Sequence, residues 1–283
     1  MEREKIKKAK RIVVKVGASV LTRAGNGRGR SLRLDERWIR NFTEQIAVLF
    51  KDGRQVIIVS SGAIAAGMGL LGMKKRPRDL PGQQACAALG QGHLMKTYEE
   101  LFRKKGFHAA QILLTWEDIR EKRRYLNAEN TLNTLLIKKA VPVINENDSV
   151  SVDEIRFGDN DKLSALVASL ISADLLIMLT DVEGLYIDRR KTVASVIKDI
   201  NPGLERLACG TDKECSAGGM KTKIDAAKIA TKSGIDCVIA DGREKNVLLK
   251  ILGGEKTGTL FQAHKNKITG KDFYEEAINR VVL

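Results

Sequence analysis

Aromatic residues are scarce in this 283-residue chain, at 5% of all positions. So few aromatic side chains argue against a surface that stacks nucleic-acid bases. Histidine is scarcer still, with only His93, His108 and His264, and none of the three falls in the polar loops described below. A histidine-based catalytic triad or histidine general base is therefore not expected.

Cysteine and long apolar runs are also limited. Cys86, Cys209, Cys215 and Cys237 show no C-x-x-C spacing and no neighbouring histidine, which indicates free thiols in a reducing compartment. The first ten residues, MEREKIKKAK, lack the apolar core of a signal peptide. Serines and an aspartate interrupt the longest apolar stretch, residues 163–179, so it predicts a helix followed by a strand. A cytoplasmic protein without a membrane partner is expected.

Charge is abundant and unbalanced, with 49 Lys and Arg against 35 Asp and Glu and a formal net charge of +14. An excess of positive charge suits nucleic acid or anionic small molecules as partners. The basic runs are scattered along the chain, which is typical of solvated faces rather than of one nucleic-acid groove. They occupy residues 3–11, 74–78, 103–105, 122–124 and 189–191.

Apolar strands alternate with amphipathic helices along most of the chain, a pattern that favours an α/β fold with a largely parallel sheet covered on both faces. The predicted strands are 11–16, 55–59, 108–114, 141–144, 175–179 and 236–240, with a further short strand at 260–261. The predicted helices include residues 35–50, 125–139 and 219–233. No internal repeat or linker stands out, so we expect one domain with two lobes around a cleft.

The most polar stretch directly follows a predicted strand. Residues 141–144 are apolar, and Asn145, Glu146, Asn147 and Asp148 come next. A second cluster, residues 158–161, reads Gly-Asp-Asn-Asp and opens a helix. Carboxylates and amides at the carboxyl ends of strands suit a small charged ligand. Two solvated turns are the alternative, because the same residue types dominate ordinary loops.

Four further sequence features suit phosphate or carboxylate groups. Lys15 interrupts an apolar strand just before Gly17, where a buried charge is costly unless it has a partner. A lysine on an edge strand reaching water is the alternative. Ser60, Ser61 and Gly62 precede a run of small residues, which lets a helix N-terminus approach a carboxylate, with a serine as the candidate helix cap. The other two features follow.

Thr180 and Asp181 come directly after the apolar strand 175–179, where an aspartate can hold a nucleotide or metal or simply cap a turn. Residues 216–223, SAGGMKTK, open a helix with two glycines that expose backbone N–H groups and a lysine one turn in. The chain lacks the Walker spacing G-x-x-x-x-G-K-[ST]. Residues 67–72 match G-x-G-x-x-G, but they lie too far after the strand to form a dinucleotide site.

Phosphoryl transfer fits a chain with lysines in such loops and no histidine nearby. An acceptor that is already an anion, such as a carboxylate, gives up no proton in the reaction. The protein must then position the reactants and neutralise charge on the transferring group. Two lysines, a Mg²⁺ ion and helix N-termini would provide that stabilisation.

Seven segments in order resemble the amino acid kinase family, over roughly residues 11–262. They are KVGASVLT (15–22), VSSGAIAAG (59–67), RRYLNAENTL (123–132), VPVINENDSV (141–150), FGDNDKLSALVA (157–168), LTDVEGLY (179–186) and AGGMKTK (217–223). The resemblance implies an open αβα sandwich with a central, mostly parallel sheet. It is nearest to members that use ATP and Mg²⁺ to phosphorylate the side-chain carboxylate of L-glutamate, the first step of proline biosynthesis.

The same resemblance implies roles for individual residues. Ser61, Asp148 and Asn160 would bind glutamate, with Asn145 as a helper. Lys15 and Lys223 would stabilise the transferring phosphoryl group, and Asp161 would orient both lysines. ATP would contact a larger set: Lys15, Thr180, Asp181, Ala217, Gly218, Gly219, Met220, Lys221, Thr222 and Lys223. No protein-held metal site is implied. Residues 1–263 would form the kinase domain, with an acceptor-binding N-terminal lobe and a nucleotide-binding C-terminal lobe.

Two positions depart from the family pattern: Ala217 stands where a threonine is usual, and Ser216 where a glycine is usual. These departures remove one side-chain bond to phosphate. Residues 264–283 are expected to form a charged tail rather than an RNA-binding domain. The unstable acyl phosphate product implies a reductase as pathway partner. Feedback inhibition by proline and assembly into a dimer or tetramer are further expectations from the resemblance.

Other family members remain alternatives, namely kinases of N-acetylglutamate or aspartate. Their loop after the first strand usually differs, and the segments NEND and GDND fit a glutamate kinase better. Isopentenyl phosphate kinases use a histidine near the acceptor, for which this chain offers no counterpart. From a different class, a basic nucleic-acid-binding regulatory protein is the remaining alternative.

Overall fold

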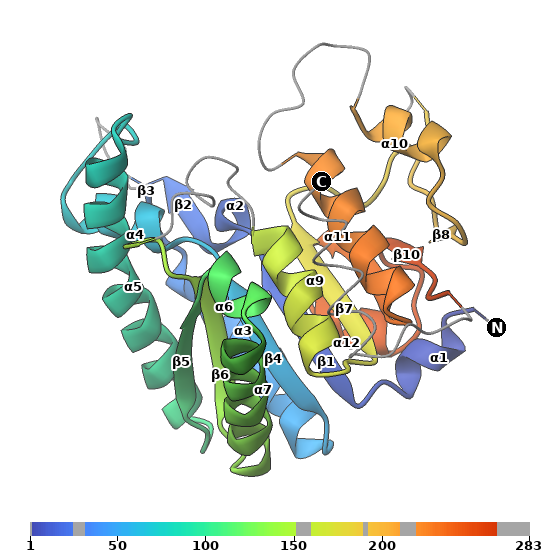
Figure 1. The fold of residues 1–283 in the computed structure, drawn as a ribbon, viewed down its shortest axis with the longest axis horizontal. Coiled ribbons are helices and arrows are strands. Elements are labelled where there is room, and N and C mark those ends of the chain that lie inside the picture. The colour runs from blue at the N-terminus through green and yellow to red at the C-terminus, as the bar shows by residue number, and fades with distance from the viewer. Residues whose placement is uncertain (1, 25–31, 151–159, 189–191, 210–218, 265–283) are drawn as a thin grey trace.

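A computed structural model describes residues 2–24, 32–150, 160–188, 192–209 and 219–264 (Figure 1). Its strands are β1 (Arg11–Val16), β2 (Thr22–Ala24), β3 (Leu32–Leu34), β4 (Gln55–Ser60), β5 (Ala109–Leu114), β6 (Val141–Glu146), β7 (Leu175–Thr180), β8 (Val196–Ile197), β9 (Asp236–Asp241) and β10 (Thr259–Phe261). Its helices are α1 (Glu4–Lys7), α2 (Ala18–Leu21), α3 (Glu36–Lys51), α4 (Ala63–Leu70), α5 (Leu80–Arg103), α6 (Trp116–Arg120), α7 (Lys122–Ile137), α9 (Asn160–Leu170), α10 (Pro202–Cys209), α11 (Met220–Lys232) and α12 (Val247–Leu252).

Eight of these strands form one sheet in the order β5-β6-β4-β1-β7-β9-β10-β8. Neighbouring strands run parallel except β10, which is antiparallel to β9. From β1 the chain builds one side of the sheet through β4, β5 and β6, and then crosses to the other side of β1 with β7. The strand order therefore switches direction at β1, where the loops at the carboxyl ends of neighbouring strands diverge and leave room for a ligand. Strands β2 and β3 pair antiparallel in a separate small sheet.

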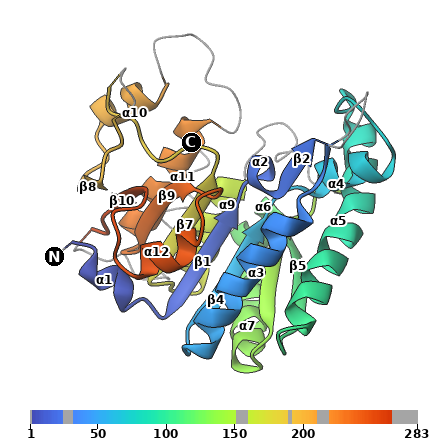
Figure 2. The same cartoon turned by 180° about the vertical axis from the view of Figure 1, so that it is seen from behind.

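Helices cover both faces of the sheet, as the two opposite views show (Figures 1 and 2). One core lies between the sheet and α3, α5 and α12, and the other lies between the sheet and α6, α7, α9 and α11. Alternation along β1 explains the division: Val14 packs into the first core and Val13 into the second. The αβα sandwich with a mostly parallel sheet is confirmed.

Local sequence signals begin several of these helices. Asp35 caps α3, since its side chain accepts a hydrogen bond from the N–H of Trp38 at 3.1 Å. Asp79 caps α5 in the same way through the N–H of Gly82, with Pro81 in the first turn. In the part of the chain that the structure describes, no helix combines the length and apolarity needed to cross a membrane.

Candidate functional site

Lys15 lies near the carboxyl end of the central strand β1, flanked by β4 and β7. Its Cα pairs with Val59 on one side and Met178 on the other, so the edge-strand alternative for this lysine is wrong. Lys15 is buried, with 6% of its surface exposed. Because Lys15 alternates with Val14 and Val16, its side chain lies on the face covered by α9 and α11.

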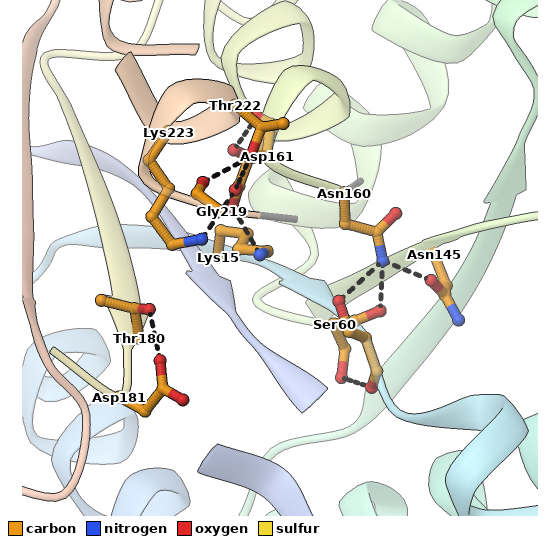
Figure 3. Close-up of polar contacts among 12 residues, drawn as sticks. Lys15, Ser60, Asn145, Asn160, Asp161, Thr180, Asp181, Gly219, Thr222 and Lys223 are labelled. Carbon is orange, nitrogen blue, oxygen red and sulfur yellow. Dashed lines mark hydrogen bonds and ion pairs between the residues drawn. The ribbon is translucent and has the colours of Figure 1, made fainter. Parts of the chain in front are cut away.

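The buried charge of Lys15 is balanced by Asp161 in the first turn of α9. Lys15 Nζ is 2.5 Å from Asp161 Oδ1, and Lys223 Nζ is 3.2 Å from Asp161 Oδ2. Asp161 is fully buried, and the side chains of the two lysines are 7% and 9% exposed. Figure 3 shows both lysines converging on this carboxylate from different elements, β1 and α11. We call Lys15, Asp161 and Lys223 the lysine pair and its carboxylate.

Thr222 holds the start of α11 against the same carboxylate. Its Oγ1 lies 3.1 Å from Asp161 Oδ2 and 2.8 Å from the carbonyl oxygen of Gly219, so its hydroxyl can donate to either oxygen. Gly219 is the residue that precedes the helix, and its backbone is extended. The first turn of α11 is thus fixed on Asp161 by both a hydroxyl and an ammonium group. Lys223 therefore has a defined position relative to Lys15.

Amide side chains form a second cluster where the N-terminus of α9 meets the carboxyl ends of β4 and β6. Asn160 Nδ2 lies 2.7 Å from Asn145 Oδ1, 3.1 Å from the Ser60 carbonyl and 3.1 Å from Ser61 Oγ. Asn145 and Asn160 are each 2% exposed. Asn160 and Asp161 are consecutive residues, so the N-terminus of α9 joins the amide cluster to the lysine pair (Figure 3).

Ser61 lines the cleft and does not cap a helix. Gly62 occupies the N-cap position of α4 with φ +98°, and no side chain caps that helix, so the expected serine cap is wrong. Glycine suits this left-handed conformation because it has no Cβ. The turn directs Ser61 Oγ toward Asn160 and leaves the first N–H groups of α4 at the cleft.

Close packing holds that turn in place. An added Cβ at Gly67 of α4 would collide with the carbonyl of Cys86, and one at Gly90 of α5 would collide with the carbonyl of Ala63. The two helix backbones are therefore in direct contact. Gly67, which opens the G-x-G-x-x-G match, serves helix packing inside α4 rather than dinucleotide binding.

One cleft of about 890 Å³ gathers the side chains that the sequence singled out. Its lining includes seven predicted site residues: Lys15, Ser61, Asn145, Asp148, Thr180, Asp181 and Lys223. Residues 17–20 and 62–65 line it as well. Asn160 and Asp161 are buried behind this surface and contact it through the side chains described above. Loops far apart in sequence therefore form a single polar cleft at the carboxyl edge of the sheet.

The other predicted residues divide into described and undescribed ones. Thr180 Oγ1 donates a hydrogen bond to Asp181 Oδ1 at 3.2 Å. Asp148 lies two residues beyond the end of β6 and is buried, at 7% exposed. Met220 is half-buried, and Lys221 is exposed on the first turn of α11. Ala217 and Gly218, together with the departure at Ser216, lie outside the described residues.

Some residues of the site were missed by the sequence reading. Gln91 of α5 is 9% exposed and bonds to Asn145, and Tyr98 of the same helix contacts Ser60 Oγ at 3.2 Å. Burial raises the pKa of the Tyr98 phenol, so Tyr98 stays neutral beside the site. Gln91 was detectable in principle, because it lies one helical turn before Leu94 and two turns before Tyr98, on the buried stripe of the helix.

The charge of Asp161 extends to Cys237 of β9. Burial raises the pKa of the Cys237 thiol well above its usual value, and the negative charges of Asp161 and Asp236 raise it further. This thiol therefore stays protonated and acts as a small apolar group under the lysine pair. Among the described residues, no group of three or more His, Cys, Asp or Glu side chains could hold a metal ion by itself.

Comparison with known families gives a match over most of the chain. The amino acid kinase family model matches residues 10–241. The glutamate 5-kinase of Nitrosospira multiformis is 49% identical over 259 residues, covering 90% of this chain and 68% of that protein. The glutamate 5-kinase of Caldanaerobacter subterraneus is 48% identical over 269 residues, covering 93% of this chain and 71% of that protein.

Solved structures share the fold at low sequence identity. The carbamate kinase of Giardia lamblia, solved with AMP-PNP, superposes with a TM-score of 0.60 at 17% identity, covering 91% of this chain and 100% of that one. The UMP kinase of Bacillus anthracis gives a TM-score of 0.57 at 14% identity, covering 90% of this chain and 96% of that one. Both likenesses concern the fold alone.

Proposed function

Because the chain belongs to the amino acid kinase family, we propose that it transfers the γ-phosphoryl group of ATP to the side-chain carboxylate of L-glutamate. The product is L-glutamyl 5-phosphate, and the reaction is the first step of proline biosynthesis. The observation that carries this proposal is the lysine pair held on one buried carboxylate at the carboxyl end of the central strands.

The lysine pair suits a transferring phosphoryl group. Lys15, Lys223 and Asp161 together carry one net positive charge in a place shielded from water. Charge that builds on the phosphoryl oxygens during transfer would be stabilised more strongly there than in water. Asp161 keeps both ammonium groups fixed before the substrate binds, so little reorganisation is needed at the moment of reaction. Asp161 is thus a positioning residue, and the two lysines are the candidate catalytic residues.

The acceptor carboxylate enters the reaction already ionised. One of its oxygens attacks the γ-phosphorus, a P–O bond forms there, and the bond to the leaving ADP oxygen breaks. No proton has to be removed, and none of the described residues that line the cleft is a histidine. The work of the protein is to hold two anionic groups in line against their mutual repulsion.

The two ends of the cleft suit the two substrates. Ser61, Asn145 and Asp148, with Asn160 behind them, would hold the amino acid, where hydroxyl and amide groups can bond a carboxylate and Asp148 an ammonium group. Thr180, Asp181 and the start of α11 would hold ATP. An acceptor-binding N-terminal lobe and a nucleotide-binding C-terminal lobe follow from this division of residues 1–263.

The residues present also fit Mg²⁺ that arrives with ATP. Mg²⁺ usually binds through one or two carboxylates together with substrate phosphates and water. Asp181 is the acid at the end of β7 that could contribute, since Asp161 is committed to the two lysines. When bound, such an ion neutralises charge on the phosphates.

The test is ADP release from Mg-ATP with a panel of acceptors: L-glutamate, N-acetylglutamate, aspartate and isopentenyl phosphate. Hydroxylamine is included because it converts an acyl phosphate into a stable hydroxamate. We expect turnover with glutamate alone and hydroxamate in proportion to ADP. Turnover with a different acceptor would move the specificity to another member of the family. Silence across the panel, from folded protein that binds ATP, would contradict the proposed activity.

A further inference from the structure

Gln91 is an unexpected polar residue in the buried face of α5. It is 9% exposed, and neighbouring positions on the same stripe, Leu94 and Tyr98, are apolar or aromatic and fully buried. Its Oε1 accepts a hydrogen bond from Asn145 Nδ2 at 2.9 Å, and its Nε2 donates to Gln111 Oε1 of β5 at 3.0 Å. Gln91 thus connects an edge strand of the sheet to the amide cluster of the cleft.

Two backbone groups determine which way the amides of this cluster point. The Ser60 carbonyl can only accept, so the nitrogen of Asn160 must face it, at 3.1 Å. The N–H of Glu146 can only donate, so the oxygen of Asn145 must face it, at 2.9 Å. With both orientations set, Asn160 Nδ2 donates to Asn145 Oδ1 at 2.7 Å (Figure 3). A flipped amide at either position would bring two donors or two acceptors together.

The orientation of Asn145 leaves its own NH₂ group pointing at α5. A buried amide donor needs an acceptor, and Gln91 Oε1 provides it. At the other end, Ser61 Oγ and the Ser60 carbonyl share one Asn160 N–H, each at 3.1 Å, because the second N–H goes to Asn145. The Ser61 hydroxyl proton is then directed elsewhere, and no described residue accepts it. Since Ser61 lines the cleft, its hydroxyl is set to donate to a ligand oxygen.

We infer that Gln91 is a positioning residue for the acceptor site, which fixes Asn145 and, through Asn160, makes Ser61 a hydrogen-bond donor to a carboxylate ligand. This inference rests on the proposed function for the identity of that ligand, L-glutamate. Gln91 lies outside the cleft lining, so it acts only through its neighbours. Its loss should weaken acceptor binding while leaving the lysine pair, on the opposite face of the sheet, in place.

The experiment compares three variants of the full chain in steady-state kinetics. Gln91→Met keeps the shape of the side chain but removes both hydrogen-bonding groups. Gln91→Glu keeps an oxygen that can accept from Asn145 Nδ2 and is the conservative rescue. Gln84→Met is the matched control, because Gln84 lies seven positions earlier in α5, is half-buried and makes no side-chain hydrogen bond to a described residue.

We expect Gln91→Met to raise the KM for glutamate by about tenfold or more, the scale for leaving a buried amide unpaired. The KM for ATP and kcat should change much less. Gln91→Glu should stay close to the wild type in the KM for glutamate, and Gln84→Met should change neither KM. An unchanged glutamate KM in Gln91→Met would overturn the inference. The inference would also be overturned if both KM values rose and kcat fell by similar factors, because that result indicates general damage to the fold.

A second measurement keeps this inference separate from the proposed function. Side-chain amide hydrogen exchange, followed by NMR, reports on Asn145 directly, and its signals are identified by their loss in Asn145→Asp. Slow exchange in the wild type should become fast in Gln91→Met, and remain slow in Gln91→Glu and Gln84→Met. If the wild type fails to use glutamate, the proposed function fails, and the exchange data still decide the role of Gln91. Unchanged protection in Gln91→Met overturns that role.

Discussion

Replacing Asp161 with asparagine removes the negative charge that two buried lysines share. The side chain keeps its size, so the perturbation is electrostatic rather than steric. Lys15 Nζ and Lys223 Nζ lie 2.5 and 3.2 Å from the carboxylate oxygens, and all three side chains are at most 9% exposed. After the substitution, two positive charges face each other across a neutral amide with little access to water.

The size of the effect follows from those distances and that burial. At an effective dielectric constant of ~20, opposite unit charges 3.2 Å apart attract by about 5 kcal/mol before desolvation is counted. Removing one partner of a buried ion pair typically costs about 3–5 kcal/mol, because the remaining charge stays buried. For a chain of this length, a loss of that size lowers Tm by on the order of 10 °C. We expect Asp161→Asn to be destabilised by this amount and to lose activity.

Urea unfolding followed by circular dichroism measures the stability change. The decisive comparison is the double variant Asp161→Asn with Lys223→Met, which removes one of the two uncompensated charges. It should be more stable than Asp161→Asn alone, although it remains inactive. The electrostatic account of this cluster is wrong if the destabilisations caused by the two substitutions simply add. It is also wrong if Asp161→Asn unfolds like the wild type.

Asp225 is the matched control for that experiment. It lies two residues after Lys223 in α11 and is half-buried. Burial raises the pKa of Asp225, because desolvation outweighs the neighbouring Lys162 and Lys221 charges. A raised pKa means that folding disfavours the charged form, so Asp225→Asn should not destabilise the protein at neutral pH. A loss equal to that of Asp161→Asn would mean that any acid near α11 behaves alike.

The remaining predictions concern separate parts of the chain. Lys223→Ala should lower kcat by about 10²–10³-fold, which corresponds to about 3–4 kcal/mol of activation free energy. The control Lys232→Ala, at the far end of α11, should leave kcat unchanged. An unchanged kcat in Lys223→Ala would mean that Lys223 takes no part in the chemistry. Asp148→Ala should raise the KM for glutamate far more than that for ATP, and equal changes would mean a misassigned pocket. Arg3 donates to four backbone carbonyls, so Arg3→Met should lower the unfolding free energy by about 2–4 kcal/mol in urea; an unchanged midpoint contradicts this. Two hydrogen bonds lower the pKa of Glu99 below its ordinary value of 4.5, chiefly the one from the backbone N–H of Ala109 and next the one with the His108 side chain. Its charged form therefore stabilises the fold above about pH 4.5, and the stability difference from Glu99→Gln should shrink as pH falls below that value; a constant difference would refute it.

Several features of the fold and site could be predicted from local sequence alone. Apolar strands alternating with amphipathic helices indicate a parallel sheet, because only that arrangement buries both faces of such strands. Lys15 stands out within an apolar strand, and so do the polar clusters at 145–148 and 158–161. A buried charge or a buried amide is costly unless it has a partner. The ordered motifs indicated the family, which the comparisons confirm.

Partnerships between distant residues could not be predicted in this way. The sequence marked Lys15, Asp161 and Lys223 as related through the family resemblance, but their common ion pair requires β1, α9 and α11 to meet at one edge. Ser61 shows the same limit. A serine before a helix normally suggests a cap, yet Gly62 takes that place and Ser61 turns to Asn160.

What the sequence by itself determined is the periodicity of the elements, the burial demanded by their apolar faces, and the residue types available for chemistry. The tertiary structure alone decided which polar group meets which. Gln91 is the clearest case, since its partners Asn145 and Gln111 lie 54 and 20 positions away and share no local pattern with it. Hydrogen bonds and ion pairs act over a few ångströms in space. Separation along the chain therefore does not reveal them until the sheet and helices are packed.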